Sequence, residues 1–371
     1  MKNILLLLTL MPFIAFGQTT AIPDDNFEQA LINLGYDNVL DDYVTTANIN
    51  TITSLSLCSL NIISLTGIED FTALNWLDCS TNQITSLDIS NNVALEYLKC
   101  VSNQLTYLDV TNNVALLHLQ AGYNSIPSLD LSQNVLLEVL AMATCAFTCP
   151  ATLTQLDVTA NTELTSLQLT QHNISFLDLS NCNKIQHLGI SGNPLGSLDL
   201  TNLSQLLSLT ATSCQLTTLN TSNNPLLKRI MCGFNQLTTL DLSFNYSLQS
   251  LGCQDNSLTS IDLRNGNNNN LVGVWSSHAL NTANNPYLHC INVDDATWSI
   301  NNWIDPNLYQ LDSSHYFSNN CSGTTSIQEH TTNKELLKII DLLGRETKES
   351  NQPLFYIYDD GSVEKRIQLD R

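Results

Sequence analysis

The chain has 371 residues and a formal net charge of −21, with 13 lysine and arginine residues against 34 aspartate and glutamate residues. Nucleic-acid binding requires clustered basic side chains that neutralise phosphates, and binding to anionic lipid requires a basic face. Between positions 18 and 325 the fixed positive charges are few: Lys99, Lys184, Lys228, Arg229 and Arg264. The composition therefore excludes nucleic acid and anionic membranes as partners of this region.

The first residues have the pattern of a secretory signal peptide. Lys2 supplies a positive charge, an apolar run occupies positions 4–16, and the small residue Gly17 precedes Gln18. This run is too short to cross a bilayer as a mature helix, and no later stretch reaches the roughly 18 apolar residues that a spanning helix needs. We expect residues 1–17 to be a signal peptide and the mature chain to be exported without a transmembrane segment.

Residues 18–51 are predicted to cap the amino-terminal end of a repeat region. The segment IPDDNFEQALINLG has Asp24 or Asp25 before a short amphipathic pattern and Gly35 after it. An acidic residue at the start and a glycine at the end are typical helix boundaries. Because the open end of a repeat stack exposes apolar residues, we expect one capping helix here.

Residues 52–289 repeat with a period of about 21 residues, which is typical of a solenoid. One rung is LNWLDCSTNQITSLDISNNVA from Leu74, and the next is LEYLKCVSNQLTYLDVTNNVA from Leu95. Apolar residues alternate twice in each rung, in L-x-C or L-x-L and again in L-D-L, which predicts two short strands facing a narrow shared core. The predicted fold is therefore a repeat solenoid dominated by β-strands, in which stacked rungs continue two parallel sheets.

This repeat resembles the leucine-rich-repeat family, in its bacterial class of about 21 residues with the pattern LxxLxCxxNxLxxLDLSxNxx. The resemblance runs from about Ile52 to Ile291, and the leucine, asparagine and LDL positions recur together many times. It departs from the pattern in six extra residues near Cys149 and in an asparagine-rich slippage at positions 265–270. The resemblance implies a binding scaffold.

Two positions of each rung have predicted structural roles. The asparagine after the first strand is expected to bond backbone groups at a buried corner; it recurs as Asn82, Asn103, Asn124, Asn193, Asn235 and Asn256. An inward position often holds a cysteine, which we interpret as a buried thiol that packs as a small apolar side chain; these cysteines are Cys79, Cys100, Cys232 and Cys253.

The second strand carries an outward carboxylate in nearly every rung. Hydrogen bonds from turn amides and from serine or threonine hydroxyls favour the ionised form of such a carboxylate. The alternative, a row of divalent-cation sites, stays open. The row consists of Asp88, Asp109, Asp130, Asp157, Asp178, Asp199, Asp241 and Asp262, with Asn220 in one rung.

Outward residues of the first strand vary from rung to rung, as they do on a recognition face. Trp76, Tyr97 and His118 occupy this position in adjacent rungs and are expected to form a strip about 10 Å long; later rungs carry His187, Arg229 and Trp275. Lys99 lies beside the strip. We predict that Trp76, Tyr97, Lys99 and His118 bind the ligand, although aromatic pairs across strands also stabilise sheets.

Residues 290–325 are predicted to cover the last rung. This segment holds Trp298, Trp303, Tyr316 and Phe317, and Cys290 and Cys321 bracket it outside the repeat pattern. Because exported proteins fold in an oxidising compartment, we expect these two cysteines to form a disulfide.

Residues 326–371 form a separate carboxyl-terminal segment, in which KELLKIIDLLGRE and LFYIYDDGSVEKRI are predicted strands and Asp360-Gly361 is a hairpin signal. The segment resembles the short sorting domain recognised by the type IX secretion system of Bacteroidetes, without the usual opening Pro-Asn-Pro. The resemblance implies passage through the periplasm and across the outer membrane, followed by release or surface attachment. The matching residues are Leu343, Gly344, Arg345, Tyr356, Tyr358, Asp360, Gly361, Lys365 and Arg366.

Catalytic signatures are missing from the sequence: there is no glycine-rich phosphate loop, HExxH helix, CxxC pair or GxSxG elbow. We therefore predict a non-enzymatic protein that uses no cofactor and no metal. The expected partner is a protein or peptide met in the secreted state or on the outer cell surface, besides the secretion machinery itself. A glycan-binding module is the alternative.

Overall fold

The computed structural model describes residues 17–144, 153–273, 278–312 and 315–321, and in the tail residues 336–340, 346–347, 354–358 and 363–366. The predicted signal peptide lies outside the described residues apart from Gly17. The chain divides after Cys321 into two compact units. The first unit contains the repeats and both caps, and the second contains the tail.

The amino-terminal cap consists of two helices and a small sheet. Strand β1 (Thr19–Ala21) pairs antiparallel with β2 (Tyr43–Thr45), and helices α1 (Asp25–Asn33) and α2 (Thr46–Ile49) accompany them. The prediction of a capping helix is confirmed, and α2 adds a short second one.

Asp24 joins this cap to the first rung. One carboxylate oxygen of Asp24 accepts hydrogen bonds from the backbone N–H groups of Asn26 and Phe27, each at 3.0 Å, which caps α1. The other oxygen accepts from the N–H groups of Ile63 and Ser64 at 2.7 and 2.9 Å. A single carboxylate therefore fixes both the start of the helix and its position on the stack.

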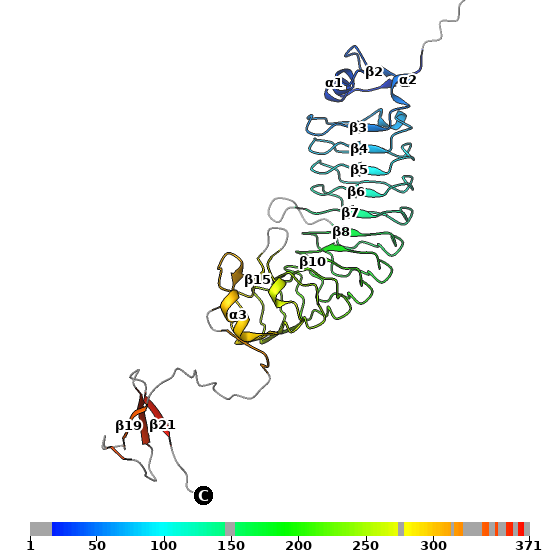
Figure 1. Ribbon diagram of the computed structural model, residues 1–371. Coiled ribbons are helices and arrows are strands. Elements are labelled where there is room, and N and C mark those ends of the chain that lie inside the picture. Colours follow the sequence, from blue (N-terminus) through cyan, green and yellow to red (C-terminus); the bar gives the residue numbers. More distant parts are fainter. Residues whose placement is uncertain are drawn as a thin grey trace, which may run out of the picture. The chain divides into compact units, whose positions relative to one another are not determined.

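The first strands of the rungs form one parallel sheet of 12 strands, here called the main sheet. Figure 1 shows these strands stacked in order below the amino-terminal cap. The 3-10 helices η1 (Ile68–Asp70) and η2 (Asn268–Asn270) lie in the connections. The strands of the main sheet are β3 (Ser54–Ser56), β4 (Trp76–Asp78), β5 (Tyr97–Lys99), β6 (His118–Gln120), β7 (Val139–Ala141), β8 (Ser166–Gln168), β9 (His187–Gly189), β10 (Ser208–Thr210), β11 (Arg229–Met231), β13 (Ser250–Gly252), β15 (Leu280–Asn281) and β17 (Tyr309–Gln310).

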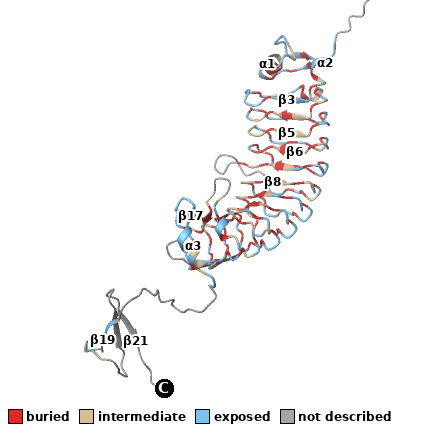
Figure 2. Cartoon of the chain, in the orientation of Figure 1, coloured by how far each residue is buried: buried red, intermediate tan, exposed pale blue. Residues whose placement is uncertain are grey.

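The core is a column of side chains enclosed by the rungs, which Figure 2 shows as buried positions alternating with exposed ones along each rung. The central leucines of successive strands, such as Leu77, Leu98 and Leu119, are fully buried. The expected buried thiols are also confirmed, since Cys79, Cys100, Cys232 and Cys253 are free and buried.

Paired second strands are limited to the later rungs, where β12 (Thr239–Asp241), β14 (Ser260–Asp262), β16 (Cys290–Asn292) and β18 (Tyr316–Ser318) form a parallel sheet of four. The prediction of two strands in every rung is therefore wrong for the earlier L-D-L segments. There, buried asparagine side chains connect neighbouring rungs just after the L-D-L segment: Asn113 donates to the carbonyl of Ile89, Asn134 to that of Val110, and Asn161 to that of Leu131.

Buried asparagines bridge the rungs at two corners. At the predicted corner, the Asn82 amide donates to the carbonyls of Leu57 and Cys79 and accepts from the N–H groups of Leu60 and Ile62. The structural role that was expected of Asn82 and of its equivalents in the other rungs is therefore confirmed. A second set, which the sequence analysis did not single out, lies at the corner after the L-D-L segment: Asn92, Asn113, Asn134, Asn161, Asn224 and Asn245.

The carboxyl-terminal cap continues the solenoid. Strand β17 extends the main sheet and β16 and β18 extend the second sheet, so the predicted aromatic cap also adds strands to both sheets. Helix α3 (Ala296–Asn302) follows β16, and the ring of Trp303 packs against those of Trp298, Tyr309 and Phe317. The longer spacing between these strands hides the repeat in the sequence.

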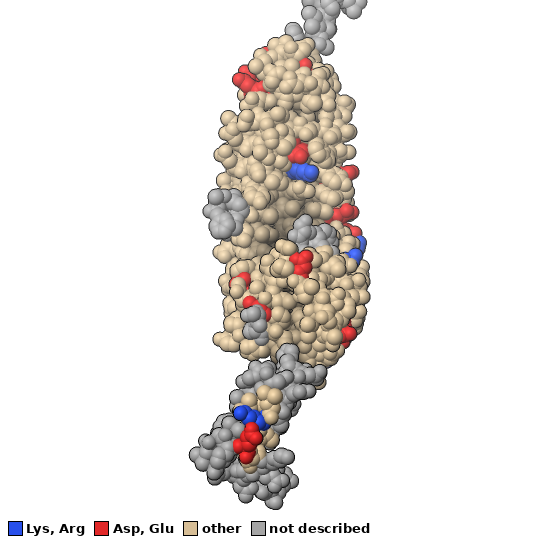
Figure 3. Space-filling view, turned by 60° about the vertical axis from the view of Figure 1, so that its left-hand side comes forward, with Lys and Arg blue, Asp and Glu red and all other residues tan. Residues whose placement is uncertain are grey.

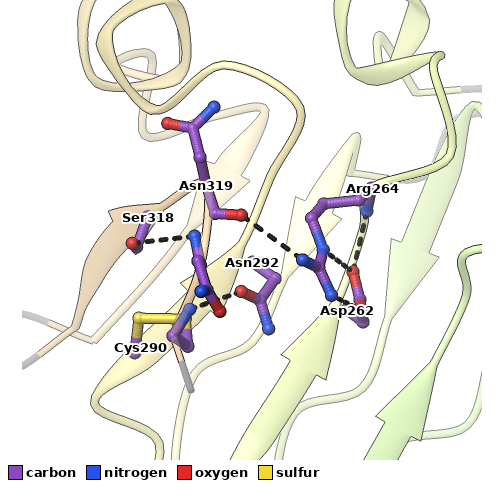
Figure 4. The surroundings of a disulfide bond; sticks show 8 residues. Asp262, Arg264, Cys290, Asn292, Ser318 and Asn319 are labelled. Atoms are coloured by element: carbon purple, nitrogen blue, oxygen red, sulfur yellow. Dashed lines mark hydrogen bonds and ion pairs between the residues drawn. A yellow bond between two sulfur atoms is a disulfide. The ribbon is translucent and has the colours of Figure 1, made fainter. Parts of the chain in front are cut away.

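A disulfide joins Cys290 to Cys321, with Cα atoms 5.8 Å apart. Figure 4 shows its surroundings, where the backbone N–H of Cys321 donates to Oδ1 of Asn292 at 2.6 Å. Nearby, Arg264 is ion-paired with Asp262 and donates to the carbonyl of Asn319. These bonds hold the end of the first unit against the preceding rung.

The second unit contains an antiparallel sheet of three strands, β19 (Leu336–Ile340), β20 (Leu354–Tyr358) and β21 (Val363–Arg366). Lys365 and Arg366 of the predicted sorting motif lie in β21. Tyr356 and Tyr358 lie in β20, and the other matching residues lie outside the described residues: Leu343, Gly344, Arg345, Asp360 and Gly361. Within the described part of the chain, no helix has the length and apolar character needed to span a membrane.

Candidate functional site

The main sheet presents its outward side chains in straight rows. Each central leucine points into the core, so the residues before and after it point outward. The strands pair without any slip from β4 to β11. Residues at equivalent positions therefore lie side by side, about 4.8 Å apart.

The structure brings the predicted aromatic residues together. Trp76 is in register with Tyr97, and Tyr97 is in register with His118. The rings of Tyr97 and His118 are stacked, with centroids 4.4 Å apart and planes inclined by 18°. All three side chains are half-buried. We call Trp76, Tyr97 and His118 the aromatic strip.

Charged groups flank the aromatic strip. Nε2 of His118 lies 4.0 Å from Oε2 of Glu138, so the imidazole has a carboxylate neighbour just before the next strand, β7. Lys99 follows Tyr97 by two residues on β5, with Asp78 opposite it on β4. The predicted site residues thus form one surface that combines aromatic rings with both signs of charge.

The opposite side of each rung carries the aspartate row. The Asp109 carboxylate accepts hydrogen bonds from the hydroxyl and the backbone N–H of Thr111, at 2.7 and 2.9 Å. These two bonds lower the pKa of Asp109. Bonds of the same kind lower the pKa of five more members of the row, and a side-chain bond from Arg264 lowers that of Asp262. The five are Asp88, Asp130, Asp157, Asp178 and Asp199.

Hollows lie along the aspartate row, and two of them are lined by Tyr107 and by Phe176, aromatic residues that the sequence analysis did not single out. One, of about 470 Å³, is lined by Asp88, Asp109 and Tyr107. The other, of about 740 Å³, includes Asp157 and Phe176 in its lining, and Phe176 is 74% exposed. Tyr107 and Phe176 precede the aspartate by two residues, a position where most rungs have serine or threonine.

Within the described ranges, no three histidine, cysteine, aspartate or glutamate side chains gather closely enough to hold a metal ion. Members of the aspartate row instead use carboxylate oxygens to accept hydrogen bonds from their own turns. The row therefore acts within each rung as a set of turn-stabilising carboxylates.

Comparison with known proteins identifies the fold. No family model and no curated protein matches the sequence. Among solved structures, an internalin (inlF) of Listeria monocytogenes is 21% identical, with a TM-score of 0.56, and the match covers 80% of this chain and 91% of that one.

Two other Listeria monocytogenes proteins also match. The functional domain of InlJ is 22% identical, with a TM-score of 0.36 and coverage of 94% and 97%. Internalin C2 is 24% identical, with a TM-score of 0.41 and coverage of 60% and 90%. At this level of identity the likeness concerns the fold, and the fold of this chain is a leucine-rich-repeat solenoid.

Proposed function

We propose that this chain is an exported, non-catalytic scaffold that binds a protein or peptide through the main sheet of its early rungs. The observation that carries the proposal is the stacked pair of Tyr97 and His118, in register with Trp76 on an outward face. Aromatic side chains held rigidly on a sheet lose little conformational entropy on binding and often dominate recognition energy. Lys99 and Glu138 add charges that orient a polar partner.

A photo-crosslinking residue at position 97 tests this assignment, with the same residue at position 176, which lies in a later rung beside the aspartate row, as a control. A peptide or protein partner should crosslink at position 97 and not at position 176. Once the partner is identified, Trp76→Ala or Tyr97→Ala should weaken its binding by about 1 to 2 kcal/mol and leave the thermal melt nearly unchanged. Intact affinity in the double variant contradicts the proposed site.

A glycan array separates this function from its alternative, a glycan-binding module. The aromatic strip lies near the carboxylates of Asp78 and Glu138, an arrangement that also suits a sugar ring. Array binding that disappears in the Tyr97→Ala variant, without any crosslinked protein, would assign the face to a glycan. Crosslinking to a protein, together with no binding on the glycan array, supports protein or peptide binding.

We further propose that residues 1–17 direct export to the periplasm and that residues 326–371 act as a type IX sorting domain, as in Bacteroidetes. The basis is the resemblance of Leu343, Gly344, Arg345, Asp360 and Gly361, with Lys365 and Arg366, to motifs of that domain. The binding scaffold would then act outside the cell, secreted or attached to the surface. The main sheet would face extracellular partners.

A further inference from the structure

The outward face of the main sheet changes charge along the solenoid. The early rungs carry carboxylates beside their strands, at Asp78, Glu96 and Glu138. The main-sheet strands β9, β10, β11 and β13, together with the residue preceding each strand, carry none. Their charged side chains are instead Lys228 and Arg229 at the start of β11. In a protein of net charge −21, two adjacent cations on a face without carboxylates are an exception that needs an explanation.

Lysine and arginine side chains are sparse on the face drawn in Figure 3, and two of the solenoid's other cations have partners of opposite charge. Nζ of Lys184 lies 2.5 Å from the carboxylate of Glu163, and Nη2 of Arg264 lies 2.5 Å from that of Asp262. Among the described residues, no carboxylate lies within ion-pairing distance of Lys228 or Arg229. These two side chains therefore keep their capacity for a negatively charged partner.

Arg229 is held along the sheet by its neighbours. Its Nη1 donates to the hydroxyl of Thr210 on β10 at 2.9 Å, and small Ser208 lies directly opposite it on that strand. The Nε–H group is buried and has no hydrogen-bond partner in the described part of the chain. Burial also lowers the pKa of this guanidinium, which remains charged at neutral pH. A partly desolvated guanidinium whose position is fixed by its neighbours pairs favourably with a carboxylate that reaches its exposed side.

We propose that Lys228 and Arg229, with Ser208 and Thr210 beside them, form a cationic patch that binds carboxylate groups of an acidic segment in the protein partner. The proposal rests on the protein-binding function assigned above and adds the chemistry of the partner. The aromatic strip and the cationic patch lie on the same sheet, on β4 to β6 and on β10 to β11. An extended partner running along the sheet would place apolar residues at the early rungs and acidic residues at the later ones.

A labelled hexaglutamate peptide is the direct probe, with hexaglutamine as its uncharged control. Because the overall charge of −21 repels hexaglutamate, binding of this peptide to the purified chain requires local attraction. We expect hexaglutamate to bind and hexaglutamine not to bind in fluorescence anisotropy. Arg229→Gln and Lys228→Gln should each weaken binding by about tenfold, as expected for the loss of a charged hydrogen bond. Arg229→Lys should fall between the wild type and Arg229→Gln, because it keeps the charge and loses the fork.

Matched controls are Arg264→Gln and Lys184→Gln, which remove one positive charge each from cations that already have partners. These variants should change the affinity for hexaglutamate by less than about twofold, since surface charges beyond a Debye length are screened. Equal losses in all four glutamine variants, or no binding of hexaglutamate to the wild type, overturn the proposal. Displacement of hexaglutamate by inorganic phosphate, but not by acetate at the same concentration, also overturns it in favour of a phosphate site.

The outcomes separate this inference from the proposed function. If Trp76→Ala weakens an identified protein partner and Arg229→Gln does not, the scaffold function stands and the cationic patch is wrong. If hexaglutamate binds through Arg229 and the partner proves to be a glycan, the patch stands only as a carboxylate-binding site, and both the protein-binding function and the acidic protein segment are wrong. Thermal melts of all variants should coincide with the wild type, because Lys228 is exposed and Arg229 lies outside the apolar core.

Discussion

The side-chain amide of Asn113 donates a hydrogen bond of 2.9 Å to the backbone carbonyl of Asn92, the residue at the same position one rung earlier. The next member continues the chain, since Asn134 donates to the carbonyl of Asn113 at 2.9 Å. Each amide also reaches a second carbonyl of the preceding rung. The rungs are therefore joined by a line of side chains on the side where the early rungs have no strand ladder.

Replacing Asn113 by alanine should destabilise the solenoid by about 1 to 3 kcal/mol, the range for leaving buried polar groups without a partner. The lower part of this range is favoured, because the carbonyls of Ile89 and Asn92 each accept another backbone bond. Urea unfolding followed by circular dichroism measures the loss. Asn112→Ala is the matched control, since Asn112 is exposed and adjacent. An equal effect of both variants would contradict the role of the buried amide.

The aspartate row should make stability depend on acid. Since the folded-state pKa of Asp109 is lowered, its contribution is fully present above the unfolded value of about 3.9 and is lost as pH falls through the folded value. The urea midpoint should be flat between about pH 7 and 5 and fall below about pH 4. Asp109→Asn should reduce that fall, because an amide oxygen keeps the turn bond, as Asn220 does toward Ser222. If the urea midpoint of Asp109→Asn falls with pH as steeply as that of the wild type, Asp109 does not contribute to the pH dependence of stability.

Thiol reactivity should separate the exposed from the buried cysteines. Burial raises the pKa of Cys100 and of Cys232 to about 12, so neither forms a thiolate near neutral pH. Cys58 is exposed and free. Iodoacetamide at pH 8 should modify Cys58 in the folded chain and leave Cys100 and Cys232 unmodified until urea is added. Peptide mapping by mass spectrometry measures this, and modification of Cys100 in the native chain would show that the rungs open.

Loss of the disulfide should loosen the carboxyl-terminal end of the first unit. Cys290 and Cys321 close a loop with a sequence separation of 31 residues, and a loop of that size contributes about 3 to 4 kcal/mol on the chain-entropy model. A variant with both cysteines replaced by serine should be cleaved by protease first around α3. Peptide mapping of the exported protein checks the bond itself, and finding both thiols free would refute it.

Deletion from about Thr325 onward should leave the protein in the periplasm, because the proposed sorting domain is removed. Fractionation of cells with an antibody against the solenoid measures its location. The truncated solenoid should keep the circular dichroism and melt of its counterpart in the full chain, which controls for misfolding. Undiminished appearance at the surface or in the medium would exclude the tail as the export signal.

The sequence predicted the stack of rungs, the capping helix begun by Asp24 and the corner asparagines, since each depends on local pattern. It did not predict that β17 extends the main sheet, because that strand follows β15 by 29 positions and lacks the repeat pattern. The stacking of Tyr97 on His118 follows from register and was expected. The sequence did not predict that Arg229 has no carboxylate within ion-pairing distance among the described residues, because this depends on which side chains three neighbouring strands bring together.

The unbroken register of the main sheet also affects how this surface can change through evolution. Each rung offers outward positions that touch the core only through their own backbone, so a substitution such as one at the half-buried Thr210 alters one site of the surface and leaves the leucines of that rung in place. Specificity can therefore drift one rung at a time without a compensating change elsewhere. Duplication of a whole rung would move Arg229 away from Tyr97 by a single strand spacing of about 4.8 Å.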